Sequence, residues 1–414
     1  MSPKPTLVLF GILGQTPFAG VAWQTLQYLE GFRRLGCDVY YVEDNGAWPF
    51  DPEQNRVTDD CHYSVRYIAR LLGACGLEGH WAYRAEAEGG RYHGLSAAQV
   101  AELFRRADVL VNLTGATLLR DEHRRVPIRI YLETDPVLPQ IEVAQGRAFT
   151  IDLLAAHTHR FTYGENFGAP DCGVPLGRFD YRPTRPPIVL DWWQPGEAEG
   201  RRTEDRGQKS GKNGPSLSSV LCPPSLCFTT VGNWRQTDKD IEWQGEHYAW
   251  SKHHEFLKFL DLPRRSGRPF ELALSGIDAA ALELLRSHGW RVVDALPLSK
   301  EVGPYRDYIR ASRGEFTVAK DQNIRLRSGW FSDRSACYLA AGRPVITQDT
   351  GFGNVLPTGR GLFAFRTADD VLAALEAIDG DYAGHSRAAR EIAAEYFAAE
   401  KVLGDLLARA GLGL

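Results

Sequence analysis

The side chains with the clearest chemical potential in this chain lie in the stretch SGWFSDRSACYLAAGRPVITQDTG, residues 328–351. Ser332 stands where a helix is expected to begin, and Asp333, Arg334 and Ser335 fill its first turn. The free N–H groups and the positive end of a helix attract anions. Two hydroxyls and a planar guanidinium suit phosphate, whereas Asp333 fits a sugar hydroxyl or a helix cap. The pattern predicts an anion site, and the alternative is a well-capped helix with a surface arginine.

Two carboxylates end an apolar run in the first half of the chain. Glu133 and Asp135 belong to the segment YLETDP, which reads as the carboxyl end of a strand. A carboxylate at a cleft can take a proton from an attacking hydroxyl group. We therefore expect Glu133 or Asp135 to act as a general base, and the alternative for Asp135, just before a proline, is a turn or cap residue.

The elements around residues 328–351 determine where their side chains point. EFTVAK reads as a strand that ends at Lys320, Gly342 is expected to end the following helix, and PVITQ is the next strand. Ligands of doubly wound folds bind at the carboxyl ends of the strands. We expect the helix start to face a cleft, with Lys320 as a phosphate ligand or, alternatively, as a surface lysine.

Strand and helix patterns alternate along the whole chain. Runs such as TLVLFGI and CDVYYVED are typical of buried parallel strands, and GVAWQTLQYLEGFRRLG has helical spacing. The alternation stops at DYRPTRPPIV, whose prolines cannot continue regular structure, and restarts at SLCFTTVGNW. These patterns predict an α/β fold with two Rossmann-like, doubly wound parallel-sheet domains that face each other across a cleft.

The breaks in the pattern give the expected domain boundaries. We predict an N-terminal domain over 1–185, an insertion over 192–222, a C-terminal domain over 223–390, and a helix over 391–414 that packs back on the N-terminal domain. The insertion is charged and rich in Gly and Ser, so it is expected to be disordered.

Composition excludes several classes of protein. A chain of 414 residues with 43% hydrophobic and 24% charged residues fits a globular protein with two domains. A net charge of -4 gives no attraction to nucleic acid or to an anionic membrane. No run reaches the roughly 20 apolar residues that span a bilayer. Seven cysteines, an odd number, indicate reduced thiols and a cytoplasmic location, and Cys222 and Cys227 lack the second pair of a zinc site.

A glycine-interrupted loop, FGILGQTPFAGVAWQ, joins the first expected strand to the first helix. Gly11, Gly14 and Gly20 do not have the GxGxxG spacing, and the loop is too long for the tight phosphate turn of a dinucleotide fold. Glu43 and Asp44 end the next strand, where such a fold has its ribose ligand. The glycine spacing nevertheless disfavours a nicotinamide oxidoreductase.

The stretch 328–351 resembles the donor-binding segment of nucleotide-sugar glycosyltransferases of the GT-B fold. In the plant-type subgroup a His-Cys-Gly-Trp-Asn-Ser loop opens the helix, a Gly-x-Pro ends it and an Asp-Gln pair follows the next strand. The matching residues are Gly329, Trp330, Ser332, Gly342 and Pro344, with Gln348-Asp349 in place of the acidic-amide pair. Arg327 and Phe331 depart from the pattern, and the ribose-binding Glu and the Glu-x7-Glu pair of retaining relatives are missing.

The resemblance extends over roughly residues 230–400 and implies a Leloir-type hexosyltransferase that moves a sugar from a nucleotide-diphosphate donor to an unidentified acceptor. The loop with Gly14 and Gly20 would border the cleft on the acceptor side. Helix dipole and basic side chains would stabilise the leaving diphosphate without an obligatory metal or other cofactor. The donor contacts that it implies are Gly232, Asn233, Lys252, Lys320, Ser328, Gly329, Trp330, Ser332, Asp333, Arg334, Ser335, Gln348 and Asp349.

Two further functions fit the same fold. A nucleotide-sugar 2-epimerase would bind the same donor without an acceptor, and it would convert the sugar nucleotide alone. The missing Glu-x7-Glu pair also fits a non-catalytic protein that binds a sugar nucleotide or a glycan, which would bind without turnover.

Overall fold

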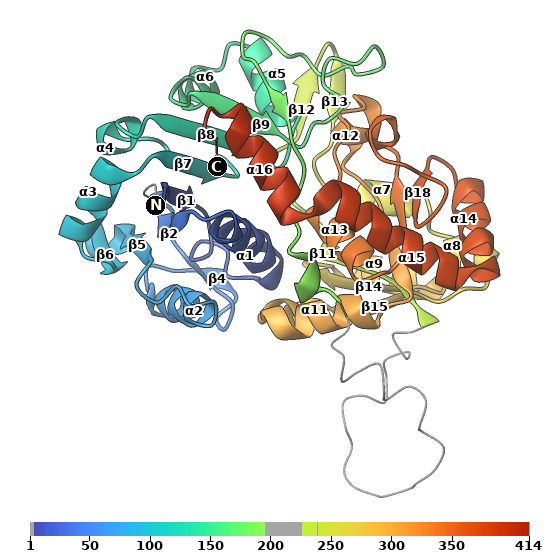
Figure 1. Ribbon diagram of the computed structural model, residues 1–414. Coiled ribbons are helices and arrows are strands. Elements are labelled where there is room, and N and C mark those ends of the chain that lie inside the picture. The colour runs from blue at the N-terminus through green and yellow to red at the C-terminus, as the bar shows by residue number, and fades with distance from the viewer. Residues whose placement is uncertain (1–3, 195–225, 238, 414) are drawn as a thin grey trace, which may run out of the picture.

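The computed structural model describes residues 4–194, 226–237 and 239–413, and the segment predicted as an insertion lies almost entirely outside these residues. Two α/β units lie side by side, each built on a largely parallel sheet with helices around it (Figure 1). The predicted fold class is confirmed.

The N-terminal unit has an eight-stranded sheet in the order β10-β9-β8-β7-β1-β2-β5-β6. All neighbouring strands are parallel except β6, which runs antiparallel to β5. The apolar β1 is central and buried along its whole length, as expected for a strand covered on both faces. The strands are β1 Thr6–Phe10, β2 Asp38–Glu43, β5 Trp81–Ala85, β6 Arg91–Gly94, β7 Val109–Leu113, β8 Ile128–Glu133, β9 His159–Thr162 and β10 Arg182–Pro183.

Helices cover both faces of this sheet, and a short antiparallel hairpin, β3 Phe50–Asp51 with β4 Arg56–Val57, precedes the second helix. The α-helices are α1 Ala19–Arg34, α2 His62–Gly73, α3 Ala97–Arg106, α4 Asp121–Arg124, α5 Leu138–Ala144 and α6 Ala148–Ala155, with 3-10 turns at Glu86–Glu88 and Leu190–Trp192. Ser96 caps α3 through a capping box with Gln99, because the serine and glutamine satisfy each other's free N–H groups.

The C-terminal unit has a six-stranded parallel sheet in the order β15-β14-β11-β16-β17-β18. Its strands are β11 Phe228–Asn233, β14 Phe270–Ser275, β15 Arg291–Asp294, β16 Gly314–Thr317, β17 Val345–Gln348 and β18 Leu362–Phe365, and β12 Ile241–Trp243 forms a hairpin with β13 Glu246–Tyr248. The helices are α7 His253–Leu257, α8 Leu262–Ser266, α9 Ala279–Ser287, α10 Leu296–Ser299, α11 Val302–Ala311, α12 Asp321–Arg325, α13 Asp333–Ala340, α14 Ala368–Gly380, α15 Tyr382–Ile392 and α16 Ala399–Arg409; Phe352–Asn354 is a 3-10 turn and Ala393–Phe397 a π-helical turn.

The chain passes between the units twice, and the two passages lie together. Ile188 donates its N–H to Phe397 O at 2.7 Å and accepts the N–H of Ala399 at 2.9 Å. After the second passage α16 returns to the N-terminal unit and packs along α1 (Figure 1). Gly31 allows this close approach, since a Cβ there would lie 2.5 Å from Leu403 Cδ1.

Two helix starts differ from what the local sequence suggests. Thr58 or Asp59 could cap a helix through CHYSVRYIARLLGACG, but α2 begins after Cys61, and the Thr58 hydroxyl accepts the N–H of Asp60. The segment YAWSKHHEFLKFLDL has helical spacing, but its first residue, Tyr248, ends strand β13, and α7 begins only at His253. Tyr248 pairs with Ile241 in that hairpin, and tertiary pairing of this kind overrides a helical pattern.

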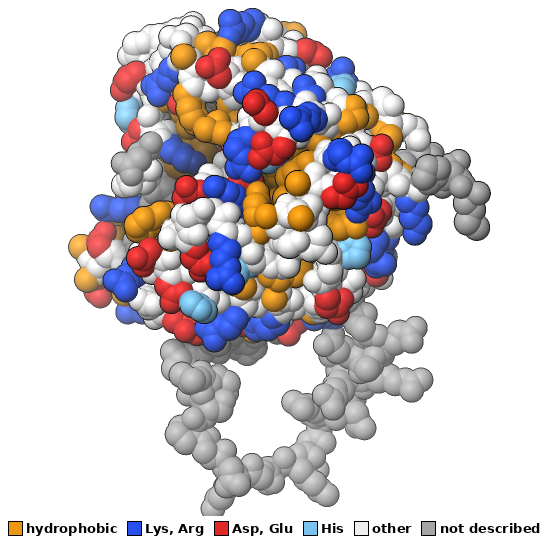
Figure 2. All heavy atoms as spheres, turned by 90° about the vertical axis from the view of Figure 1, so that its left-hand side faces the viewer, with side chains coloured by type: hydrophobic (Ala, Val, Ile, Leu, Met, Phe, Trp, Pro, Cys, Tyr) orange, Lys and Arg blue, Asp and Glu red, His pale blue; other side chains and the backbone are white. Residues whose placement is uncertain are grey.

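Acidic and basic side chains are interspersed on the face of the molecule shown in Figure 2, in keeping with the small net charge of -4. Among the described residues, none of the helices has both the length and the apolarity needed to cross a membrane.

Candidate functional site

A lysine of the C-terminal unit meets a carboxylate of the N-terminal unit where the carboxyl edges of the two sheets face each other. Lys320 follows β16, and its Nζ lies 2.7 Å from Asp135 Oδ1, beyond the end of β8. The same ammonium lies 3.2 Å from the centroid of the Trp250 ring, a cation–π contact. Burial lowers the pKa of Lys320, and Asp135 opposes that effect. The predicted site residues Asp135 and Lys320 are therefore in direct contact.

A second lysine, Lys252, lies close to Lys320 and has no counter-ion among the residues that the structure describes. Its Nζ lies 4.9 Å from the centroid of the Trp330 ring, and among the described residues no hydrogen bond or ion pair engages it. Burial lowers its pKa to about 7, and the nearby charges of Arg334 and Lys320 lower it further in the same direction. An anion beside this ammonium would relieve its repulsion by the two other cations.

Arg334 lies beside these lysines but is largely engaged within its own unit. Its Nε donates to Glu315 Oε1 at 2.6 Å, Nη1 to the carbonyl of Val231 at 2.6 Å and Nη2 to Thr317 Oγ1 at 2.9 Å. A guanidinium has five N–H donors, so two remain for a ligand. A Cβ on Gly232 would lie 3.9 Å from Nη1, so the guanidinium lies next to this glycine at the end of β11.

The helix start predicted at Ser332 is present, and Ser332 is the N-cap residue of α13. Its side chain makes no capping hydrogen bond. The carboxylate of Asp333 instead accepts the backbone N–H of Arg334, and burial raises the pKa of this carboxyl group. Asp333 stands in the first turn of α13, where its negative charge suits the positive end of the helix. The hydroxyl of Ser335 is buried and has no partner among the described residues.

Ser328, Gly329 and Trp330 join the two units. The carbonyl of Ser328 accepts the N–H of Asn166 at 3.1 Å, and Trp330 Nε1 donates to the carbonyl of Thr134 at 2.9 Å. Gly329 has a φ of +81°, and a Cβ there would lie 2.3 Å from the backbone nitrogen of Asn166. This part of the motif therefore forms an interface between the units, which also places the Trp330 ring next to Lys252.

The side chains of Gln348 and Asp349 make hydrogen bonds with other residues of the protein. Gln348 accepts the N–H of Ala319 at 3.2 Å and donates to Glu255 at 2.8 Å, which fixes the backbone just before Lys320. Burial would raise the pKa of Asp349, but hydrogen bonds from Gly351 N–H, Arg327 and Arg366 lower it. Asn233 is exposed and accepts a hydrogen bond from Ser275, so it is accessible at the carboxyl end of β11.

Glu133, expected at a cleft as a possible base, is instead buried and bound by groups of the N-terminal unit. Its carboxylate accepts hydrogen bonds from Gln140 Nε2 at 2.9 Å and from Thr162 Oγ1 at 2.5 Å. Burial raises the pKa of Glu133 to about 7, although these hydrogen bonds act to lower it. Gln140 Oε1 in turn accepts the N–H of Val137 at 2.6 Å, a β-branched residue held at a φ of +93°. Such strain is stored where a loop must be placed accurately, so Glu133 positions the loop that carries Asp135.

Side chains of the N-terminal unit also fix the position of its glycine loop. Glu43 accepts the N–H groups of Gly14 at 2.6 Å and Gln15 at 2.7 Å. Gly14 lies against Tyr83, where a Cβ would come within 2.5 Å of the ring. Gly20 lies in α1, and a Cβ added there would lie 3.8 Å from the hydroxyl oxygen of Tyr305. The loop borders the C-terminal unit, but the N–H groups of residues 14 and 15 are already used.

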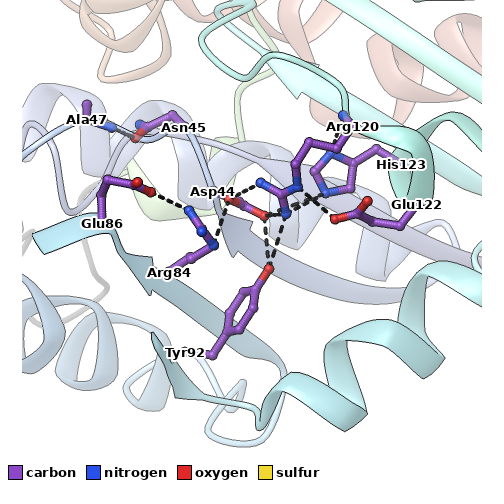
Figure 3. Close-up of polar contacts among 9 residues, drawn as sticks. All are labelled: Asp44, Asn45, Ala47, Arg84, Glu86, Tyr92, Arg120, Glu122 and His123. Atoms are coloured by element: carbon purple, nitrogen blue, oxygen red, sulfur yellow. Dashed lines mark hydrogen bonds and ion pairs between the residues drawn. The ribbon is translucent and has the colours of Figure 1, made fainter. Parts of the chain in front are cut away.

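The adjacent carboxylate, Asp44, is surrounded by donors (Figure 3). Arg120 binds it through two nitrogens and Tyr92 OH donates to it at 3.0 Å. Burial would raise the pKa of Asp44, but hydrogen bonds from His123 and Arg120 lower it to about 2. Glu43 and Asp44 are therefore both occupied, and neither is free to bind the ribose of a dinucleotide.

No known family model matches the chain, and no curated protein matches its sequence. Solved structures match the fold. An alpha-glucosyltransferase in complex with UDP and DNA has a TM-score of 0.58 at 10% identity, over 99% of this chain and 100% of that one. HepE of Anabaena, in complex with UDP and glucose, has 0.55 at 11%, over 98% and 100%. AviGT4, a glycosyltransferase of avilamycin A biosynthesis, has 0.51 at 12%, over 99% and 97%. The chain has the GT-B fold of these enzymes.

Proposed function

We propose that this protein is a glycosyltransferase that binds a nucleoside-diphosphate sugar between its two units and transfers the sugar to an acceptor. The observation that carries the proposal is the Lys252 ammonium, which has no counter-ion among the described residues and lies near Lys320 and Arg334. A diphosphate supplies the missing negative charge. The similar folds solved with UDP make uridine diphosphate the first ligand to test.

The contact between Asp135 and Lys320 suggests how donor binding prepares the base. In the ligand-free protein Lys320 neutralises Asp135 at 2.7 Å. A diphosphate that binds Lys320 competes with this ion pair, which leaves the Asp135 carboxylate available to accept the proton of an attacking hydroxyl group. Lys252, Lys320 and the two remaining donors of Arg334 then stabilise the charge on the leaving diphosphate, with no obligatory metal in this step.

The N-terminal unit supplies the acceptor side in this proposal, since the glycine loop and the strained loop that carries Asp135 both border the cleft. The reaction belongs in the cytoplasm, as the seven scattered cysteines of the sequence suit a reducing compartment.

The decisive experiment is a calorimetric titration of UDP into the parent protein and the Lys252→Met variant. Loss of one charge-assisted contact of about 1.5 to 3 kcal/mol should weaken UDP binding roughly 10- to 150-fold. The matched control is Lys258→Met, because Lys258 lies on the exposed end of the same segment and pairs with Glu255 at 2.5 Å. Equal UDP affinity in parent and Lys252→Met would refute the diphosphate site.

A second measurement separates transfer from the other reactions of a sugar nucleotide. UDP-glucose is incubated alone and with a panel of hydroxyl acceptors, and the products are identified. Acceptor-dependent release of UDP supports transfer. Isomerisation of the sugar without an acceptor would indicate an epimerase, and binding without any turnover would indicate a binding protein.

A further inference from the structure

Three metal-ligating side chains converge in the N-terminal unit, on elements that carry none of the lysines described above. Cys61 is the N-cap residue of α2, Glu88 ends the 3-10 turn Glu86–Glu88, and His93 lies on β6. Cys61 Sγ lies 3.0 Å from Glu88 Oε1 and 3.7 Å from His93 Nε2, and His93 Nε2 lies 3.1 Å from Glu88 Oε2. A thiol, a carboxylate and an imidazole therefore point at one common centre.

The separations are of the size found between ligand atoms of one zinc ion. With Zn–S near 2.3 Å and Zn–N or Zn–O near 2.0 to 2.1 Å, ligand atoms lie about 3.3 to 3.6 Å apart. The Sγ–Nε2 separation of 3.7 Å and the Nε2–Oε2 separation of 3.1 Å lie within about half an ångström of that range, and the other carboxylate oxygen of Glu88, Oε1, lies 3.0 Å from Sγ. Sulfur and imidazole donors select zinc over the hard cations Ca²⁺ and Mg²⁺, which prefer oxygen.

Solvent reaches the site from one side. Cys61 is buried at 3% exposure, whereas the side chains of His93 and Glu88 are 21% and 31% exposed. Three protein ligands leave the fourth position of a tetrahedral ion open toward solvent, as in zinc sites that bind water or a substrate. Arg91 lies 3.8 Å from Glu88, and it is the nearest charged competitor for this carboxylate.

The cluster is also connected to the glycine loop at the cleft. Ser64, in the first turn of α2, donates its hydroxyl to the carbonyl of Gly14 at 2.7 Å. His93 is the register partner of Tyr83 in the β5–β6 pair, and Tyr83 is the ring that packs against Gly14. An ion that links α2 to β6 would therefore fix both elements on which the loop rests.

We infer that Cys61, Glu88 and His93 form a binding site for a single Zn²⁺ ion that ties the start of α2 to the β5–β6 hairpin and keeps one coordination position open. The site is separate from the diphosphate site and places no metal on the donor.

The test uses the full chain after removal of metals with a chelator, titrated with Co²⁺ as a spectroscopic substitute for Zn²⁺. One equivalent should give an intense thiolate-to-cobalt charge-transfer band, and Zn²⁺ should displace it. Since even second-shell changes weaken metal binding by about 10- to 100-fold, loss of a direct ligand in Glu88→Gln or His93→Ala should weaken Co²⁺ binding by at least about 100-fold. Both side chains are partly exposed, so these variants keep the fold.

Cys61→Ser should abolish the charge-transfer band, and Cys75→Ser is the matched control because Cys75 lies just after the same helix. A band that survives in Cys61→Ser, or Co²⁺ affinity unchanged in both Glu88→Gln and His93→Ala, overturns the site. Absence of stoichiometric binding in the parent protein also overturns it, and the three residues are then only a hydrogen-bonded cluster.

Discussion

The carboxyl edges of the two sheets arrange their charges in opposite ways. At the N-terminal edge the buried carboxylates Glu43, Asp44 and Glu133 all accept hydrogen bonds from groups of their own unit. At the C-terminal edge Lys252 has no counter-ion among the described residues, and Lys320 is paired only with Asp135 of the other unit. The charges of the first edge therefore fix the shapes of loops, whereas Lys252 and Lys320 at the second edge carry the proposal of a diphosphate site.

Arg334 is the exception at the C-terminal edge, and removing it should have the largest effect. Arg334→Ala leaves the fully buried Glu315 without its cation, so the free energy of unfolding should fall by about 3 to 5 kcal/mol. Denaturant unfolding measures this. The control Arg366→Ala removes a largely exposed partner of Asp349 and should cost under about 1 kcal/mol. A normal stability of Arg334→Ala together with weak UDP binding would make Arg334 a ligand rather than a support.

Asp135→Asn tests whether the N-terminal edge supplies one chemically active group. If Asp135 is the base, turnover should fall about 100-fold or more, while UDP affinity is kept or increases because Lys320 loses its competing partner. Steady-state kinetics with UDP-glucose and calorimetry with UDP measure the two quantities. Parent-like turnover in Asp135→Asn would remove this carboxylate from the mechanism.

Gly329→Ala tests how closely the two edges must approach. A methyl group would lie 2.3 Å from the nitrogen of Asn166, and the residue would keep a φ of +81°. The strain and the forced separation should cost about 1 to 3 kcal/mol of unfolding free energy. Gly276→Ala is the control, since it has φ +65° but open space for the methyl group. Equal losses in the two variants would show that backbone strain, and not contact between the units, is what matters.

The pH dependence of UDP binding examines Lys252 directly. Its pKa is lowered to about 7 in the free protein, and a bound diphosphate would raise it again because it favours the charged form. Above pH 7 the lysine must take up a proton on binding, so affinity should fall by up to about tenfold per pH unit. Lys252→Met should remove most of this slope. A slope that persists in the variant would assign the proton to another group, such as Lys320.

Glu133→Gln should leave UDP binding unchanged and alter only the pH dependence of stability. The folded-state pKa of Glu133 is raised to about 7, above its ordinary value of about 4.3. Its contribution to stability is therefore present below about pH 4.3 and is lost as the pH rises through 7. The variant should show a shallower decline in unfolding free energy over this window, with Glu43, whose pKa is also about 7, supplying the rest. An unchanged slope would mean that Glu133 does not titrate there.

The alternation of strands and helices could be predicted because its periodicities are local properties of the sequence. The position of Ser332 at a helix start follows from the same local rules. The contacts of the site do not, since Asp135 and Lys320 are 185 residues apart and meet only through the arrangement of the two units. Sequence patterns likewise could not show that Arg334 turns toward Glu315 or that Glu133 faces inward. They also could not show that β13 extends to Tyr248, the first residue of a segment with helical spacing.

The cluster of Cys61, Glu88 and His93 was missed for a related reason. The three residues do not have the short, regular spacing of a zinc motif, and Cys61 and His93 come together only because β6 turns back antiparallel on β5. A cysteine at a helix N-terminus and a histidine on a strand become informative once that hairpin is known.

The return of α16 to the first unit has a consequence for biosynthesis. Leu403, Leu406 and Leu407 belong to the same hydrophobic core as β1 and α1, and Arg34 binds Glu400 across 366 residues of sequence. Domains usually fold one after another as they leave the ribosome. Here the first unit cannot complete its core until residues near 400 have been translated. We therefore expect the apolar surface of α1 to stay uncovered during synthesis of the second unit, where chaperones that shield hydrophobic surface would bind it.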